Sequence, residues 1–300
     1  MQVRKAIIPC AGFGTRFLPV TKVLPKELLP IVDTPALCYI VDEAVKSGIE
    51  EIMIVISPQK ESIKRLFEPN VRLNEHLLSQ GEKEAYELAN AEIGAKVSFV
   101  TQKTMDGNAN AIKLCKDFVN GEPFAVLFGD DVMYVKEGEK PVTKQLIDAY
   151  YATNGASIVG CQRTSEEVAR RCGVMITKSA IDDKTTLIDG IIEKPQSELP
   201  SALVSLGRFV LAPSIFDAIE RTPYTRGEAY LTDSISILAK EKDVCAYEFS
   251  ARRYDIGNKE GYLEATIEYA LRSNMLKDEF SEYLELSLIH ISEPTRPEPI

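Results

Sequence analysis

The residues best suited to chemistry lie in one stretch near the start of the chain. Residues 11–31, AGFGTRFLPVTKVLPKELLPI, place Gly12 and Gly14 before Arg16 and Lys26, on a path with three prolines. Glycine lets backbone N–H groups approach a ligand, proline stiffens a long loop, and arginine and lysine bind phosphate. Neither the third glycine of a dinucleotide fingerprint nor the Gly-Lys-Ser/Thr of a P-loop follows. The glycines alone are equally compatible with a structural turn, and the basic residues favour a loop that binds polyphosphate.

Acidic residues follow a later apolar segment. Residues 123–131, PFAVLFGDD, end in Asp130 and Asp131. Ligands bind beyond the carboxyl ends of strands in open parallel sheets, and carboxylates there can hold Mg²⁺ that is bound to substrate phosphates. A polar turn with a capping aspartate is the alternative. Asp255 lies between a predicted strand and a predicted helix, where a helix cap is common, and its spacing does not connect it with Asp130.

Two further segments carry polar side chains at strand ends. Gln102 ends a predicted strand shortly before Gly107, and its amide has the donor and the acceptor that a base edge requires. Glu193 and Lys194 end another predicted strand, although exposed Glu-Lys pairs are also common on protein surfaces. These positions are therefore candidates for ligand contacts.

Composition narrows the possible classes of protein. The formal net charge of −10 argues against broad nucleic-acid binding. Two histidines in 300 residues argue against Ser-His-Asp chemistry and histidine-rich metal sites, and six cysteines without a CxxC pair argue against a zinc site or a disulfide framework. No apolar run approaches the roughly 20 residues of a membrane helix, so we expect a cytoplasmic protein without membrane partners. Catalysis would then depend on carboxylates, lysines, arginines, backbone amides and a hard cation.

Alternating patterns indicate the elements that position these residues. Buried strands are predicted at 3–10, 49–57, 95–102 and 123–131, with helices between them, which is typical of βαβ units and a parallel sheet. After residue 155 the chain is richer in short strands. We expect an α/β fold with a mixed, mainly parallel Rossmann-like sheet flanked by helices, and a β-rich, substrate-covering portion in its second half.

The chain reads as one domain over residues 1–285. We expect a nucleotide-binding half at 1–135, a substrate-binding half at 136–258 and C-terminal helices at 259–285. Residues 286–300, LSLIHISEPTRPEPI, break from the helical pattern and end rich in proline. We interpret this tail as a translated sequencing-adaptor read-through.

Together these segments resemble the sugar-nucleotide pyrophosphorylases. The first motif matches that family almost throughout, and the motifs FGDD, GVM, EKP, GRFVL, GEAYLTDSI and YDIGNKEGY occur in the family's order across roughly residues 3–275. The resemblance is greatest to the bacterial uridylyltransferases of the family. It implies transfer of a nucleotidyl group from UTP to glucose 1-phosphate, Mg²⁺ as the cofactor, a sugar-binding second half and a homo-oligomer, either a dimer or a tetramer.

The resemblance also implies roles for matching residues. Lys26 and Arg16 would bind the triphosphate, and Lys194 would bind the sugar phosphate. Asp130 and Asp255 match the Mg²⁺ ligands, which supplies the connection that spacing cannot. The remaining matches contact the nucleotide (Ala11, Gly12, Gly14, Glu27), its base (Gln102, Gly107) or the sugar (Gly173, Glu193, Gly207).

Two departures from the family leave alternatives open. Residues 107–111 read Gly-Asn-Ala-Asn-Ala, which is nearer to the thymidylyltransferases than the usual Gly-Leu-Gly-His-Ala, and Cys172 stands where tyrosine is usual. A thymidylyltransferase, or a uridylyltransferase for another hexose phosphate, is therefore an alternative. A non-catalytic sensor of sugar nucleotides is a further alternative, but such a protein is expected to lack Lys26, Asp130 or Asp255, and all three are present here. An NAD-dependent dehydrogenase would need an acid after the second strand, which instead ends in Ser-Pro-Gln at residues 57–59.

Overall fold

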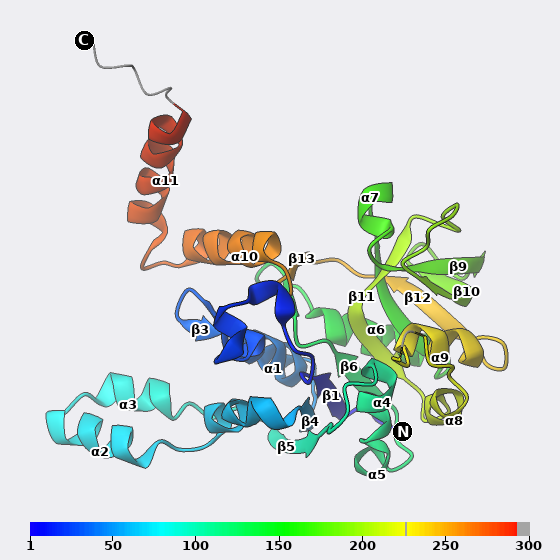
Figure 1. The fold of residues 1–300 in the computed structure, drawn as a ribbon, viewed down its shortest axis with the longest axis horizontal. Helices are drawn as coiled ribbons and strands as arrows, with labels where there is room; N and C mark the ends of the chain where they lie inside the picture. The colour runs from blue at the N-terminus through cyan, green and yellow to red at the C-terminus, as the bar shows by residue number, and fades with distance from the viewer. Residues whose placement is uncertain (226, 293–300) are drawn as a thin grey trace.

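One large mixed sheet organises the molecule. The computed structural model describes the backbone of residues 1–225 and 227–292 and the side chains through Ser287. The nine strands of the sheet follow the order β5-β4-β1-β6-β11-β8-β12-β10-β9 (Figure 1). The strands from β5 to β6 are parallel. Strand β11 then pairs antiparallel with both β6 and β8, so the second half of the chain extends the same sheet.

The bounds of the sheet strands agree with the apolar segments of the sequence. The strands are β1 (Lys5–Pro9), β4 (Glu51–Ile56), β5 (Lys96–Thr101), β6 (Phe124–Leu127), β8 (Ser157–Arg163), β9 (Gly173–Ala180), β10 (Thr185–Glu193), β11 (Leu203–Leu211) and β12 (Val244–Glu248). Two small sheets stand apart from it, formed by β2 (Pro30–Ile31) with β3 (Thr34–Pro35) and by β7 (Asp131–Tyr134) with β13 (Arg252–Asp255). The predicted mixed α/β sheet is confirmed.

Helices cover both faces of the sheet because alternate strand residues point to opposite sides. In β1, Ala6 and Ile8 pack in the same core as helix α1, whereas Ile7 packs in the core on the other face. The helices of the first face are α1 (Ala36–Lys46) and α6 (Val142–Ala152). Those of the second face are α4 (Asn108–Lys113), α5 (Lys116–Val119), α8 (Ile215–Glu220) and α9 (Leu231–Leu238).

The remaining helices lie at the periphery. They are η1 (Thr15–Phe17), η2 (Val20–Lys22), η3 (Lys26–Leu28), η4 (Pro58–Phe67), α2 (Val71–Gln80), α3 (Lys83–Ala89), α7 (Glu166–Ala169), α10 (Lys259–Arg272) and α11 (Lys277–Ser292). The α2–α3 hairpin and α11 project from the body (Figure 1). No helix in the described part of the chain is long and apolar enough to cross a membrane.

Helix α11 differs from the sequence-based expectation. It continues without a break to Ser292, so the predicted loss of the helical pattern at Leu286 is wrong. Leucine is a good helix former and isoleucine an intermediate one, and no Gly or Pro interrupts residues 287–292, so the preceding helix continues through them. Residues 293–300 of the tail lie outside the described residues, and the origin of the tail stays a prediction.

Candidate active site

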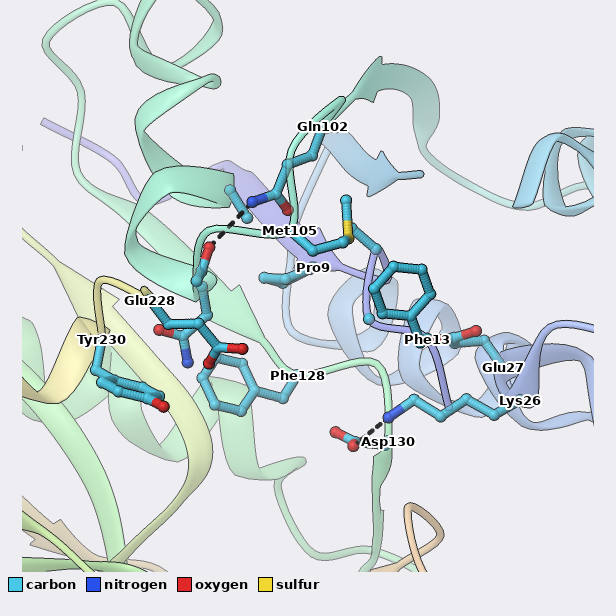
Figure 2. A pocket seen from close by; sticks show the side chains of 15 residues that line it. Pro9, Phe13, Lys26, Glu27, Gln102, Met105, Phe128, Asp130, Glu228 and Tyr230 are labelled. Carbon is cyan, nitrogen blue, oxygen red and sulfur yellow. Dashed lines mark hydrogen bonds and ion pairs between the residues drawn. The ribbon is translucent and has the colours of Figure 1, made fainter. Parts of the chain in front are cut away.

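A pocket of about 400 Å³ opens at the carboxyl ends of β1, β5 and β6. Open parallel sheets place their ligands at this edge. Figure 2 shows Gln102 at one end of the pocket and the Lys26–Asp130 pair at the other. Seven of the predicted site residues line it, namely Ala11, Gly12, Lys26, Glu27, Gln102, Gly107 and Asp130.

A buried ion pair fixes the loop that bears Lys26. The Lys60 ammonium donates to both carboxylate oxygens of Glu27 at 2.7 Å and to the Cys10 carbonyl at 2.8 Å. Glu27 is 1% exposed and Lys60 is 5% exposed. Burial raises the pKa of Glu27, and the charges of Lys60 and Lys26 offset only part of that rise. Lys60 is not among the predicted site residues, because nothing in its local sequence pattern points to Glu27.

Lys26 contacts Asp130 at the end of the pocket where phosphate binding is predicted. The ammonium nitrogen lies 2.5 Å from Asp130 Oδ2. Burial raises the pKa of Asp130, but the charge and hydrogen bond of Lys26, the charge of Arg253 and a backbone hydrogen bond together outweigh burial, and the net shift is downward. Burial lowers the pKa of Lys26, and the charges of Asp130 and Glu27 reverse that shift. Both groups are therefore charged at neutral pH, and the cation of Lys26 faces the pocket.

The other end of the pocket is built around Gln102 and Gly107. Gln102 is 5% exposed, and its amide nitrogen donates to Asp106 Oδ1 at 2.9 Å and to the Gly107 carbonyl at 3.1 Å. Gly107 has φ of 109°, and a Cβ there would lie 2.5 Å from the Ala229 backbone nitrogen. Only glycine permits this close approach. The predicted base-reading pair is thus brought into direct contact.

Residues 228–231 form the wall opposite the loop; they belong to the GEAYLTDSI motif, but no site role is predicted for them. Glu228 and Tyr230 line the pocket, and Figure 2 shows them across the cavity from Phe13 and Glu27. The Asn108 side chain accepts a hydrogen bond from the Leu231 backbone at 2.7 Å. This contact gives Asn108 a structural role at the position where the sequence departs from the uridylyltransferases.

The β7–β13 ribbon carries Asp255 to Asp130. Asp131 stands opposite Asp255 in the antiparallel register of the two strands. A Cβ placed on Gly257 would lie 2.7 Å from Asp130 Oδ2 and 3.0 Å from Asp255 Oδ1, so the two carboxylates border the same point. Local spacing could not predict this proximity, because Asp130 lies in the turn before β7 and Asp255 ends β13, which is distant in sequence.

The two carboxylates suit a hard divalent cation. Asp130 and Asp255 offer oxygen donors, which Mg²⁺ prefers, and Mg²⁺ usually keeps water and takes substrate phosphates as its other ligands. In the part of the chain that the structure describes, no group of three or more His, Cys, Asp and Glu residues is arranged to hold a metal ion. The donor set therefore fits a cation that shares its coordination with phosphate.

The predicted sugar-binding residues lie beside this pocket without lining it. Gly173 pairs with Glu193 across β9 and β10, and a Cβ on Gly173 would lie 3.1 Å from the Thr232 methyl carbon at the start of α9. Burial raises the pKa of Glu193, and Lys194 offsets part of the rise. Gly207 lies elsewhere, against Asp131 and Phe128, where its φ of 67° and the lack of room both require glycine.

Three other predicted residues are not part of the pocket wall. Arg16 is exposed in η1, and Gly14 shapes the turn before it with φ of 68°. Lys194 has φ of 48°, and its side chain is 54% exposed and lies 3.7 Å from Glu193. The structure does not bring Arg16 or Lys194 onto Lys26 and Asp130, and their roles stay predictions.

Comparison with known proteins places these features in a family. A family model described as nucleotidyl transferase matches residues 5–271. UTP–glucose-1-phosphate uridylyltransferase 2 of Streptococcus pyogenes serotype M3 (strain ATCC BAA-595 / MGAS315) is 41% identical over 299 residues, which is 99% of each chain. UTP–glucose-1-phosphate uridylyltransferase of Streptococcus pyogenes is 42% identical over 286 residues, which is 94% of each chain.

Solved structures agree with this relationship. UDP-glucose pyrophosphorylase complexed with UDP-glucose matches with a TM-score of 0.82 and 34% identity, covering 91% of this chain and all of the other. The UTP-bound UGPase from Acinetobacter baumannii matches with a TM-score of 0.86 and 32% identity, covering 94% of this chain and 99% of the other. The chain belongs to the nucleotidyl transferase family. Its full-length relatives in that family include the UTP–glucose-1-phosphate uridylyltransferases.

Proposed function

We propose that this protein transfers the uridylyl group of UTP to glucose 1-phosphate, forming UDP-glucose and pyrophosphate. The observation that carries this proposal is the layout of the pocket, which holds an amide-glycine pair at one end and a lysine-aspartate pair at the other (Figure 2). That layout suits a ligand with a base and a polyphosphate. The names of the full-length relatives support UTP and glucose 1-phosphate as the substrates.

The reaction requires positioning more than proton transfer. A phosphate oxygen of glucose 1-phosphate attacks the α-phosphorus of UTP in line, and a new P–O bond forms. The bond between the α-phosphorus and the bridging oxygen breaks, and its electron pair leaves with pyrophosphate. The attacking oxygen is already anionic, so no general base is needed, which fits a chain with two histidines. Phosphoryl-transfer enzymes work chiefly by positioning and electrostatic stabilisation.

The chain's own charges supply that stabilisation. Lys26 faces the pocket and would bind the phosphates that leave, together with Arg16. Lys194 would hold the phosphate of the sugar. Asp130 and Asp255 would hold Mg²⁺, which neutralises phosphate charge when it is bound.

A substrate panel tests the proposal. Pyrophosphate release and nucleotide-sugar formation are measured for UTP, dTTP, CTP and GTP, each with glucose-, galactose- and N-acetylglucosamine 1-phosphate. We expect the highest kcat/KM for UTP with glucose 1-phosphate. Preference for dTTP would instead assign the thymidylyltransferase alternative that residues 107–111 suggest. UDP-glucose binding without any turnover would assign a sensor.

A pair of variants connects the activity with the pocket. Asp130→Asn should lower kcat/KM by about 10²- to 10³-fold, the range seen when one transition-state contact is removed. Asp33→Asn changes an exposed aspartate in the β2–β3 turn and should leave kcat/KM unchanged. Equal activity of the two variants would place the chemistry away from Asp130.

A further inference from the structure

An arginine lies between two carboxylates on one face of the β7–β13 ribbon. Arg253 and Asp255 are two residues apart in β13, so their side chains share a face. Asp131 stands directly opposite Asp255 in β7. The guanidinium of Arg253 therefore has an aspartate on either side, and one of them is the predicted cation ligand.

The arginine contacts the two carboxylates unequally. Its Nε and Nη2 lie 2.7 Å and 2.6 Å from Asp131 Oδ1, whereas Nη2 lies 3.8 Å from Asp255 Oδ2. The Asp131 side chain is 6% exposed, while that of Asp255 is 34% exposed. Arg253 therefore pairs closely with the buried Asp131, whereas the more exposed Asp255 lies farther from the guanidinium.

The surroundings hold Asp131 in this position. It packs against Gly207, where any side chain would overlap Asp131 Oδ2. Its backbone carbonyl accepts a 2.7 Å hydrogen bond from Arg208, which is 1% exposed and is itself paired with Glu43. A buried carboxylate without a partner is strongly unfavourable, so Asp131 requires the charge of Arg253, whereas Arg253 has a second carboxylate, Asp255, within reach.

We propose that Asp131 is a positioning residue that holds Arg253 away from Asp255 and thereby keeps Asp255 available to the cation. Without the charge of Asp131, the guanidinium would turn to the remaining carboxylate within its reach. Asp255 would then be neutralised by an ion pair with Arg253. A cation could bind Asp255 only after displacing the guanidinium. This inference rests on the proposed function, because it takes Asp130 and Asp255 as the residues that meet the cation.

Mn²⁺ binding in the absence of nucleotide tests this role independently of turnover. Mn²⁺ prefers the same oxygen ligands as Mg²⁺, and electron paramagnetic resonance measures its free concentration. Asp131→Asn should weaken Mn²⁺ binding by about 10- to 100-fold, the usual effect of losing an outer-shell partner of a metal ligand. The double variant Asp131→Asn with Arg253→Met should bind Mn²⁺ like the unmodified protein, because the competing cation is gone.

A control comes from the same strand. Arg252 lies on the opposite face of β13 and pairs with Glu264 and Glu268. Arg252→Met should leave the Mn²⁺ affinity within twofold. Circular dichroism establishes that each variant is folded. If Asp131→Asn does not fold, Arg253→Met and the double variant carry the test, and both must bind Mn²⁺ at least as tightly as the unmodified protein.

The outcomes separate this inference from the proposed function. Unchanged Mn²⁺ affinity in Asp131→Asn would overturn the positioning role. Weakened binding that the double variant does not restore would make Asp131 itself a ligand, and would also overturn it. Asp255→Asn serves as the reference. If that substitution leaves Mn²⁺ binding intact, the metal assignment in the proposed function fails, whatever Asp131 does.

Discussion

At the scale of single residues, Lys26 combines two tasks in one side chain. Its ammonium pairs with Asp130, and it also faces the end of the pocket where phosphate binding is proposed. On substrate binding, Lys26 would exchange Asp130 for substrate phosphate, and Asp130 would exchange Lys26 for the divalent cation. An ion pair that is exchanged in this way keeps both groups ionised and oriented before substrate arrives.

Replacing this lysine gives a first prediction. Lys26→Met should lower kcat/KM by about 10²- to 10³-fold. It should also raise the pKa of Asp130, because the positive charge of Lys26 no longer offsets the effect of burial. The acidic limb of the pH–kcat/KM profile should therefore move to higher pH. Steady-state kinetics across pH measures both effects. Lys22→Met alters an exposed lysine of the same loop and is the control. An unmoved acidic limb would contradict this account of Asp130.

At the scale of elements, the pocket depends on close approach between distant segments. The turn at Gly107 meets Ala229, and the Ala229 carbonyl accepts a 3.1 Å hydrogen bond from Ala109. Backbone hydrogen bonds therefore join the turn directly to the 228–231 wall. A side chain at Gly107 would overlap Ala229 and push the turn and the wall apart, at the end of the pocket where base binding is proposed.

This geometry predicts a loss of nucleotide affinity. Gly107→Ala should weaken UTP binding by at least about tenfold, since it adds both φ strain and overlap with the backbone of residue 229. Gly138→Ala is the matched control, because Gly138 also has positive φ, of 82°, but has no atom within 4 Å of the added carbon. Isothermal titration calorimetry compares the two variants. Similar affinities in both would show that the contact with Ala229 is unimportant.

A second element-level feature is the buried pair that joins α1, α6 and β11. Glu43 Oε2 lies 2.7 Å from Arg208 Nη2, and Glu43 Oε1 accepts hydrogen bonds from the Thr143 backbone and hydroxyl at 3.0 Å and 2.7 Å. Through Arg208 this network reaches the backbone of Asp131. It therefore connects the packing of the helices with the site.

Breaking this pair should destabilise the fold strongly. Glu43→Ala leaves the buried Arg208 without its counter-charge, and such a loss costs about 3–5 kcal/mol in free energy of unfolding. Urea denaturation followed by circular dichroism measures the change. Glu50→Ala removes an exposed partner of Arg4 at 3.9 Å and should cost less than about 1 kcal/mol. Equal losses in the two variants would contradict the stabilising role of the buried pair.

At the scale of the whole molecule, the pocket and the C-terminal helix α11 lie in different parts of the structure. The pocket lies at the edge of the central sheet, whereas α11 packs on α10 and projects from the body (Figure 1). A chain ending at residue 276 should therefore bind UTP within twofold of the full chain, as measured by calorimetry. A loss of more than tenfold would show that α11 supports the pocket. Gel filtration of both chains also tests whether α11 contributes to the expected homo-oligomer.

The amino-acid sequence by itself determined the parts that depend on local pattern. The apolar segments around β1, β4 and β6 and the glycine-rich loop are recognisable because burial and turn formation impose periods and residue types over a few positions. Asp130 is recognisable in the same way, because it follows directly after a short apolar segment. The resemblance added the order of the motifs, and with it the match of Asp255 to a metal ligand.

Only the tertiary structure decided which distant residues meet. Lys60 contacts Glu27, Arg253 pairs with Asp131, and residues 228–231 close the pocket, yet none of these pairings has a signal in local spacing. The mixed sheet brings β6 beside β11, and the β7–β13 ribbon brings Asp131 opposite Asp255. Contacts of this kind follow from strand order and register, which the packing of the entire chain selects, so a short stretch of sequence does not contain them.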